Sequence, residues 1–191
     1  MPSLPNLIDE LISGDDLRAE QASAVLIRRG TEALPLLLGV IRSSSPDHRW
    51  WALHSLAHIY HAQADQALVD ALGDPDSSVC QAAALGLRQR PLAAALPRLI
   101  SLLGSEDGLL SRLAGDALAA LGAVGTAALA LAATDPSPAA RIAAVRALAL
   151  NEDPAAMPAL YAALEDTSAL VEHWATDGLE RRGLDMVYFQ P

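Results

Sequence analysis

The chain has 191 residues and a formal net charge of −10 at pH 7, and 52% of its residues are hydrophobic although only 4% are aromatic. Every basic residue is arginine, which excludes a lysine Schiff base, a lysine general base and a phosphate-binding P-loop. The acidic balance argues against a nucleic-acid surface and against anionic membranes. The single cysteine, Cys80, excludes an intramolecular disulfide and a cysteine cluster for zinc.

The composition favours closely packed helices. Ala and Leu supply most of the apolar content, whereas a β-sandwich would need Val, Ile, Thr and aromatic residues. Residues 1–16 lack the basic start and long apolar core of a signal peptide, so we expect a cytoplasmic location. Arginine without lysine, together with the richness in Ala and Leu, indicates a bacterial genome of high GC content.

Six similar segments follow one another along the chain. In order they are LRAEQASAV ending at Val25, HRWWALHSL at Leu56, VCQAAALGL at Leu87, LSRLAGDAL at Leu118, ARIAAVRAL at Leu148 and VEHWATDGL at Leu179. Their end points lie 31, 31, 31, 30 and 31 residues apart. A small residue precedes each end point, and alanine stands four residues before it in every segment except the first, which has Gln21. A period near 30 residues in six copies predicts a helical solenoid.

A second apolar helix is expected between these segments, as in TEALPLLLGVIR and PAAMPALYAALED. A capping residue before a proline marks the expected helix starts, at Ser45-Pro46, Asp74-Pro75, Asp135-Pro136 and Asp153-Pro154. Residues 117–133 carry no charge and approach the length that spans a bilayer. The repeat places a turn between Gly122 and Gly125, so we expect two short buried helices there instead of one span.

We therefore predict an all-α fold, with a single domain at residues 1–183. Its six repeats are expected at about residues 4–30, 31–62, 63–91, 92–123, 124–152 and 153–183. The tail, residues 184–191, is too short for another helix pair. We expect it to fold over the open apolar end of the last repeat, because the terminal face of a solenoid needs covering. The alternative is a disordered or non-native tail.

The recurring D-P start and the A-A-x-x-x-L run that follows it, as in DPDSSVCQAAALGL and DPSPAARIAAVRAL, resemble HEAT repeats. The likeness is to the short HEAT-like type found in phycobilisome (bilin) lyases, and it covers essentially residues 4–183. It implies a right-handed α-solenoid of antiparallel helix pairs, in which the second helix of each pair lines the concave face. The resemblance is specific for the fold and weak for the function, because such solenoids serve many roles.

Helical geometry places the unusual residues of HRWWALHSLAHIYHA, residues 48–62. At about 100° per residue, the small residues and leucines of each segment share one packed face. Roughly opposite that face lie Trp50, His54, His58 and His61. We expect them at the surface, on the side that the resemblance makes concave. Trp51 and Trp174 fall near the edge of the packed face, and we expect both to be partly buried.

His54, His58 and His61 would share one stripe of a helix, and two histidines four residues apart can bind a metal together. This helix offers no carboxylate as a third ligand, because Asp65 lies beyond its end. The repeated His-Glu pairs of the HEAT-repeat di-iron hydroxylases are missing, and only the reversed pair Glu172-His173 occurs. We therefore expect a solvated or ligand-contacting polar face, with no bound metal and no cofactor.

Arg18, Arg49 and Arg141 recur seven residues before an end point, with aspartates just upstream. In HEAT families such Asp and Arg residues form a ladder that links neighbouring repeats, so we interpret them as structural. Cys80 takes the same place in the third repeat, where we expect a small packing residue. A reactive thiol would need a positive neighbourhood, which Arg49 could supply from one repeat away.

The same geometry defines a candidate binding surface along the second helices. Its residues are Trp50, His54, His58, His61, Leu85, Arg88, Arg112 and Asp116. Beyond it, the face continues through Gln81, Ile142, Arg146, His173 and Asp177. No spacing forces a Ser-His-Asp triad or a carboxylate pair, so no catalytic residue is assigned.

Exposed Trp, His and Arg on one ridge suit an interface hot spot, which indicates a non-catalytic scaffold or adaptor that docks another protein on its concave face. The alternative that the resemblance implies is a bilin-lyase-like protein, which would bind a tetrapyrrole or assist its attachment to a partner protein. Trp50 and the histidines could then stack on the chromophore. A HEAT-like DNA glycosylase is disfavoured by the net charge.

Overall fold

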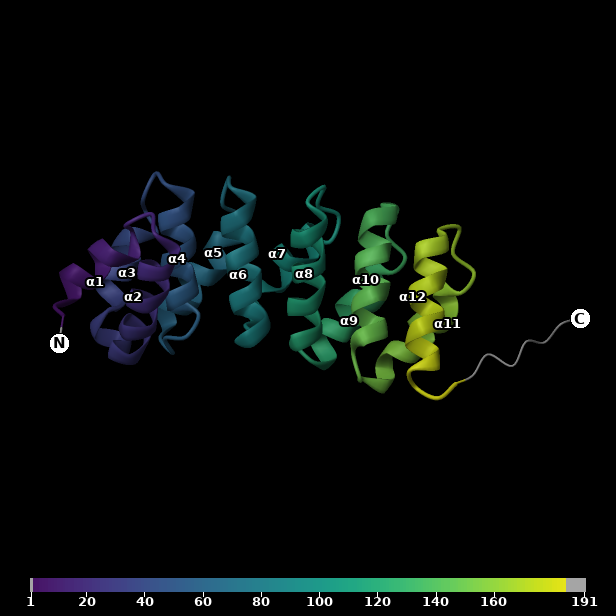
Figure 1. The fold of residues 1–191 in the computed structure, drawn as a ribbon. Coiled ribbons are helices and arrows are strands. Elements are labelled where there is room, and N and C mark those ends of the chain that lie inside the picture. The colour runs from purple at the N-terminus through teal and green to yellow at the C-terminus, as the bar shows by residue number, and fades with distance from the viewer. Residues whose placement is uncertain (1, 185–191) are drawn as a thin grey trace, which may run out of the picture. The chain divides into compact units, whose positions relative to one another are not determined.

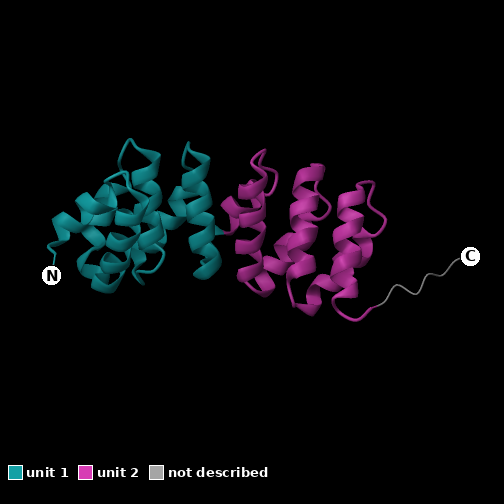
Figure 2. Cartoon of the chain, viewed as in Figure 1, with its two compact units in different colours: residues 1–95 teal, residues 96–191 magenta. Residues whose placement is uncertain are grey.

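The computed structural model describes residues 2–184, which contain twelve α-helices and no strand (Figure 1). This confirms the predicted all-α class. The chain forms two compact units, residues 1–95 and residues 96–191 (Figure 2). The single domain and the repeat boundaries expected from the sequence stay predictions.

Unit 1 contains three helix pairs. Its helices are α1 (Leu4–Leu11), α2 (Asp16–Arg29), α3 (Leu34–Val40), α4 (Pro46–Leu56), α5 (Ala62–Ala71) and α6 (Ser77–Gln89). Each odd-numbered helix packs against the even-numbered helix that follows it, and the second helices contact one another in the order α2, α4, α6. Short 3-10 turns lie at Gly30–Glu32 and Ala93–Ala95.

Unit 2 repeats this arrangement. Its helices are α7 (Leu96–Leu102), α8 (Gly108–Ala120), α9 (Ala123–Ala132), α10 (Pro138–Leu150), α11 (Met157–Ala163) and α12 (Ala169–Glu180), with a 3-10 turn at Pro154–Ala156. The pairs are α7 with α8, α9 with α10 and α11 with α12, and α10 packs between α8 and α12. Within each unit the second helices lie next to one another, so their side chains can form a continuous surface.

The chain breaks between α8 and α9, where the sequence alone could be taken for a membrane span. Gly122, with a φ of 66°, lies in the turn between the two helices. The turn was expected to extend to Gly125, but Gly125 lies inside α9, where an added Cβ would come 1.7 Å from the Leu118 carbonyl oxygen. Over residues 2–184, every helix is too short or too polar to cross a membrane.

The caps confirm two of the four predicted helix starts. Ser45 caps α4 with Pro46 in its first turn, and Asp153 caps the 3-10 turn that precedes α11. At the other two sites the cap falls two residues later. Asp76 caps α6, and Ser137 caps α10. The aspartates before them hold the turn itself, since their Oδ1 atoms accept from the backbone N–H two residues on.

The packed stripe of the second helices is more regular than the sequence interpretation held. The first repeat ends at Leu26, which is fully buried, and not at Val25, which is half-buried. Counting from Leu26 puts Ala22, rather than the exposed Gln21, four residues before the end point. All six repeats then carry a buried alanine at that place: Ala22, Ala52, Ala83, Ala114, Ala144 and Ala175. Because alanine has a small side chain, these positions let neighbouring second helices approach closely.

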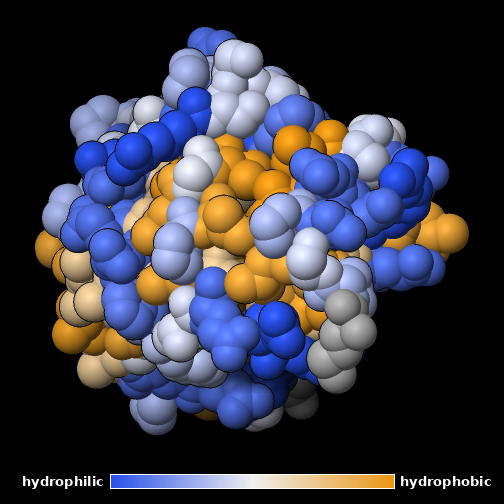
Figure 3. Space-filling model, turned by 90° about the vertical axis from the view of Figure 1, so that its left-hand side faces the viewer, coloured by the Kyte–Doolittle hydropathy of each residue, from blue (hydrophilic) through white to orange (hydrophobic). Residues whose placement is uncertain are grey.

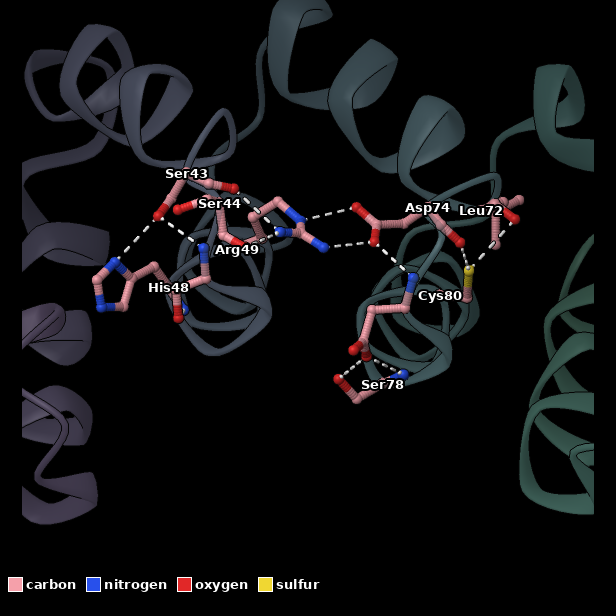
Figure 4. Close-up of polar contacts among 10 residues, drawn as sticks. Ser43, Ser44, His48, Arg49, Leu72, Asp74, Ser78 and Cys80 are labelled. Atoms are coloured by element: carbon pink, nitrogen blue, oxygen red, sulfur yellow. Dashed lines mark hydrogen bonds and ion pairs between the residues drawn. The ribbon is translucent and has the colours of Figure 1, made fainter.

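With the first repeat ending at Leu26, the position seven residues earlier is Ala19, so Arg18 no longer occupies the place that Arg49 and Arg141 hold in their repeats. Arg49 donates from Nε and Nη2 to the two carboxylate oxygens of Asp74, at 2.8 and 2.7 Å, and from Nη1 to the Ser43 and Ser44 carbonyls (Figure 4). In unit 2, Arg141 binds Asp166 in the same bidentate way. Both arginines reach the turn of the following repeat, which confirms a structural ladder. Arg18 is not part of it, because it pairs with Glu10 of α1.

Cys80 occupies the ladder position of the third repeat and is buried. Its thiol donates to the Leu72 and Asp74 carbonyl oxygens (Figure 4). Burial raises the pKa of this thiol, so the thiolate is disfavoured at neutral pH. The packing role expected for Cys80 is confirmed.

The N-terminal end of unit 1 has an apolar centre surrounded by hydrophilic side chains (Figure 3). Leu4 and Ile8 of α1, and Ile12 directly after it, are partly buried and pack against the core of the unit. Residues 185–191 lie outside the described residues, so the prediction that the tail covers the last repeat stays a prediction.

Candidate functional site

Trp50, His54 and His58 form an aromatic ladder on one side of α4 and the turn after it. The Trp50 and His54 rings stack with centroids 5.3 Å apart and planes within 6° of parallel. The His54 and His58 rings meet edge to face at 5.7 Å. Residues four apart on a helix lie over one another, which explains the stack.

Trp50 is less exposed than expected. It is half-buried, packs against the core of unit 1, and meets Trp51 edge to face with centroids 4.9 Å apart. Trp51 is 9% exposed and Trp174 is half-buried, so the partial burial expected for both is confirmed. Part of the Trp50 side chain therefore belongs to the core, and the prediction that it points away from the core holds only for the exposed part.

His61 does not lie on the histidine stripe. Helix α4 ends at Leu56, and His61 is the N-cap residue of α5, where its Nδ1 accepts from the Gln63 backbone N–H at 3.2 Å. The prediction that His54, His58 and His61 share one stripe was therefore wrong, because the chain turns between His58 and His61. Among residues 2–184, no group of three His, Cys, Asp or Glu side chains is arranged to hold a metal ion.

The surroundings of His54 favour its neutral form. Burial lowers the pKa of His54 below its ordinary value, the positive field of His58 lowers it further, and Glu20 opposes both effects. Because the folded-state pKa is lowered, the stability that His54 contributes is complete above about pH 6.5. That contribution is lost as the pH falls through the lower folded-state value.

Trp50, His54, His58 and Leu85 line a small hollow of about 10 Å³, together with Ala57, Ala82, Gly86 and Gln89. The structure therefore brings together four of the predicted binding residues, from α4, the turn after it and α6. Arg88 is exposed near the end of α6 and does not line this hollow. Arg112 and Asp116 stand on α8 of unit 2 and belong to the surface of that unit.

A larger hollow of about 550 Å³ opens on the other side of Trp50. Its lining residues are Asp16, Glu20, Pro46, Asp47, Trp50, Trp51 and Ser78. The three acidic residues are exposed, and the lining contains no basic side chain. A first repeat that ends at Val25 puts Ala19 at the position of Trp50, which hides this acidic hollow. The corrected first repeat matches Trp50 with Glu20, and Ala19 is buried.

Unit 2 carries a separate cleft of about 850 Å³ over α8, α10 and α12. Leu109, Ile142 and Trp174 supply most of its apolar lining, and Arg112 and Arg146 supply two cationic groups. Arg146 donates to Asp116 at 2.8 Å and lies 5.9 Å from the Trp174 ring centroid. Of these five lining residues, Arg112 was in the predicted binding set, and Ile142 and Arg146 were expected on the continuation of that face.

The chain belongs to the HEAT repeat family, since the family model for HEAT repeats matches residues 4–88 and 126–187. Among solved structures it is similar to the complex of CpcE and CpcF of phycocyanin lyase from Nostoc sp. PCC7120. That match has 26% identity and a TM-score of 0.61, over 75% of this chain and 96% of that one. The predicted resemblance to HEAT proteins of the bilin-lyase type is confirmed.

Two further structures share the fold. The YibA protein of Escherichia coli matches with 18% identity and a TM-score of 0.66, over 96% of this chain and 72% of its own. A designed armadillo repeat protein in complex with a (KR)4 peptide matches with 21% identity and a TM-score of 0.52, over 94% and 99%. No curated protein matches the chain. The protein is thus an α-solenoid of HEAT repeats.

Proposed function

We propose that this protein is a non-catalytic scaffold that docks a partner protein on the ladder of Trp50, His54 and His58. The observation that carries the proposal is the position of Trp50. Its side chain packs against the core of unit 1 and also lines two hollows, so the packed indole stands where a partner can cover it. Half-buried tryptophans beside surface hollows have the properties of interface hot spots.

The charge around the ladder defines the chemistry of that partner. Asp16, Glu20 and Asp47 give one side of Trp50 a negative potential, on a chain that is itself acidic. A segment with Arg or Lys side chains and an apolar anchor would complement this surface. A cation over an indole face adds further attraction.

Trp50→Ala is expected to weaken binding of peptides selected against this surface by at least about tenfold, because a truncated hot spot costs about 2 kcal/mol or more. Peptides would be selected from a random displayed library on the intact protein, and their affinities measured by fluorescence anisotropy. Tyr161→Ala removes an exposed aromatic ring from unit 2 and is the matched control.

The selected peptides should be rich in Arg and Lys, and their binding should weaken as salt rises. The variant should also melt somewhat below the intact protein, since Trp50 packs against the core. Peptides that bind the intact protein and Trp50→Ala equally would refute the proposal.

A second candidate function follows from the 26% identity to the phycocyanin lyase complex, which extends over nearly all of that chain. In that case the protein would bind a tetrapyrrole, or assist its attachment to a partner protein, with the chromophore stacked on Trp50 and His54. The Trp50 and His54 rings, 5.3 Å apart and nearly parallel, would supply the aromatic contacts for such a chromophore.

Titration with biliverdin separates the two functions. If the chain holds a tetrapyrrole, the visible absorbance of the pigment should shift and saturate at one equivalent, and Trp50→Ala should abolish the shift. An unchanged pigment spectrum at concentrations where the selected peptides bind would leave the scaffold as the function.

A further inference from the structure

We infer that the cleft over α8, α10 and α12 is a second binding site, which takes a small organic anion with a flat aromatic body. The site lies wholly within unit 2 and is independent of the ladder of Trp50, His54 and His58. Its volume of about 850 Å³ lies in the range of small-molecule sites, which is about 300 to 1,000 Å³.

The apolar part of the site comes from three neighbouring second helices. Leu109 of α8 is 44% exposed, and Ile142 of α10 and Trp174 of α12 are half-buried. The six corrected end points put Ile142 at the position that Trp50 holds in the second repeat. A large apolar residue on this face of α10 is not required by the packed alanine stripe, which lies on the opposite side of the helix. A ring that covers Leu109, Ile142 and Trp174 would remove this surface from water.

The charge of the site comes from two arginines with different environments. Arg146 is held on two sides, by the Asp116 carboxylate and by the Trp174 ring, and its side chain is only 18% exposed. Arg112 is exposed at the edge of the cleft and makes no hydrogen bond or ion pair within residues 2–184. It is therefore the cation that is available to a ligand.

The only carboxylate that lines the cleft is Glu106, among the residues that the structure describes. Asp116 pairs with Arg146 beside the cleft, so two cations face two carboxylates and the site is close to neutral, on a chain whose net charge is −10. Arg146 is neutralised by that pair, and Arg112 is the lining cation that remains for an anionic ligand. Arg112 would bind its carboxylate or sulfonate while the aromatic body lies against Trp174.

The test uses 1-anilinonaphthalene-8-sulfonate, an aromatic anion whose emission rises in apolar surroundings, and N-phenyl-1-naphthylamine, its uncharged counterpart. Energy transfer from Trp174 locates the dye, measured in Trp50→Phe/Trp51→Phe so that Trp174 is the sole tryptophan. If that protein does not fold, the difference between the intact protein and Trp174→Phe gives the same information.

Arg112→Gln should weaken the anionic dye about fivefold, as expected for one exposed charge-assisted contact. Arg112→Lys should restore most of the affinity, and the uncharged dye should bind all three proteins alike. Arg28→Gln removes an equal charge from an exposed site on α2 and should leave the anionic dye unaffected.

Three results would overturn the inference. The first is an absence of energy transfer from Trp174 to the dye. The second is an equal loss of affinity for the anionic dye in Arg112→Gln and Arg28→Gln, and the third is an affinity for this dye that does not change in Arg112→Gln. The first would place the dye elsewhere, for example at the apolar N-terminal end of unit 1. None of these results bears on the peptide-docking proposal, because that proposal is tested through Trp50.

Discussion

Ala83→Trp is expected to lower the melting temperature by roughly 10 °C, which corresponds to a loss of at least about 3 kcal/mol from overpacking. Ala83 lies in the alanine stripe of α6 and is fully buried. One turn further on, a Cβ added to Gly86 would lie 2.9 Å from the Ala57 Cβ and 3.1 Å from Leu68 Cδ2. The helices around this stripe leave no room for an indole, so α6 would have to move away from α4.

The measurement is a thermal melt followed by circular dichroism. Gln89→Trp introduces the same side chain at an exposed position of α6 and should melt close to the unmodified protein. If Ala83→Trp and Gln89→Trp melted alike, the stripe would not be the packed face, and the corrected repeat positions would be wrong.

The packed face could be predicted because the alanine and leucine recur at nearly constant spacing. The one error fell in the first repeat, where Val25 and Leu26 are adjacent and both apolar. Either could end the repeat, since one interval of 30 residues occurs elsewhere in the chain. Only burial distinguishes them. With Val25 as the end point, Ala19 takes the position that matches Trp50. With Leu26, Glu20 takes it, which reveals the acidic residues beside Trp50.

The candidate site was harder to predict because it depends on where helices end. No glycine or proline separates Leu56 from His61, so the periodic pattern extended α4 past its end at Leu56 and carried His61 onto the wrong element. The cleft of unit 2 was missed for another reason. Leu109, Ile142 and Trp174 belong to three different repeats, and their common cleft depends on side-chain shape and not on spacing.

The largest electrostatic effect in unit 1 should come from Asp74. Asp74→Asn is expected to cost about 2–3 kcal/mol, because it leaves the Arg49 guanidinium without its counter-ion in a largely buried place. The two side chains are only 13% and 12% exposed. Arg49 also donates to the Ser43 and Ser44 carbonyls, so the pair joins the turn before α4 to the turn before α6.

Urea unfolding measures this cost, with Asp9→Asn on the exposed side of α1 as the control for loss of one surface carboxylate. The double variant Arg49→Met/Asp74→Leu should recover much of the loss. Burying two charges costs nearly as much as their attraction returns, whereas one unpaired charge carries the whole desolvation cost. A double variant as unstable as Asp74→Asn would show that the hydrogen bonds from Arg49 to the two carbonyls stabilise this turn, and that the ion pair contributes little.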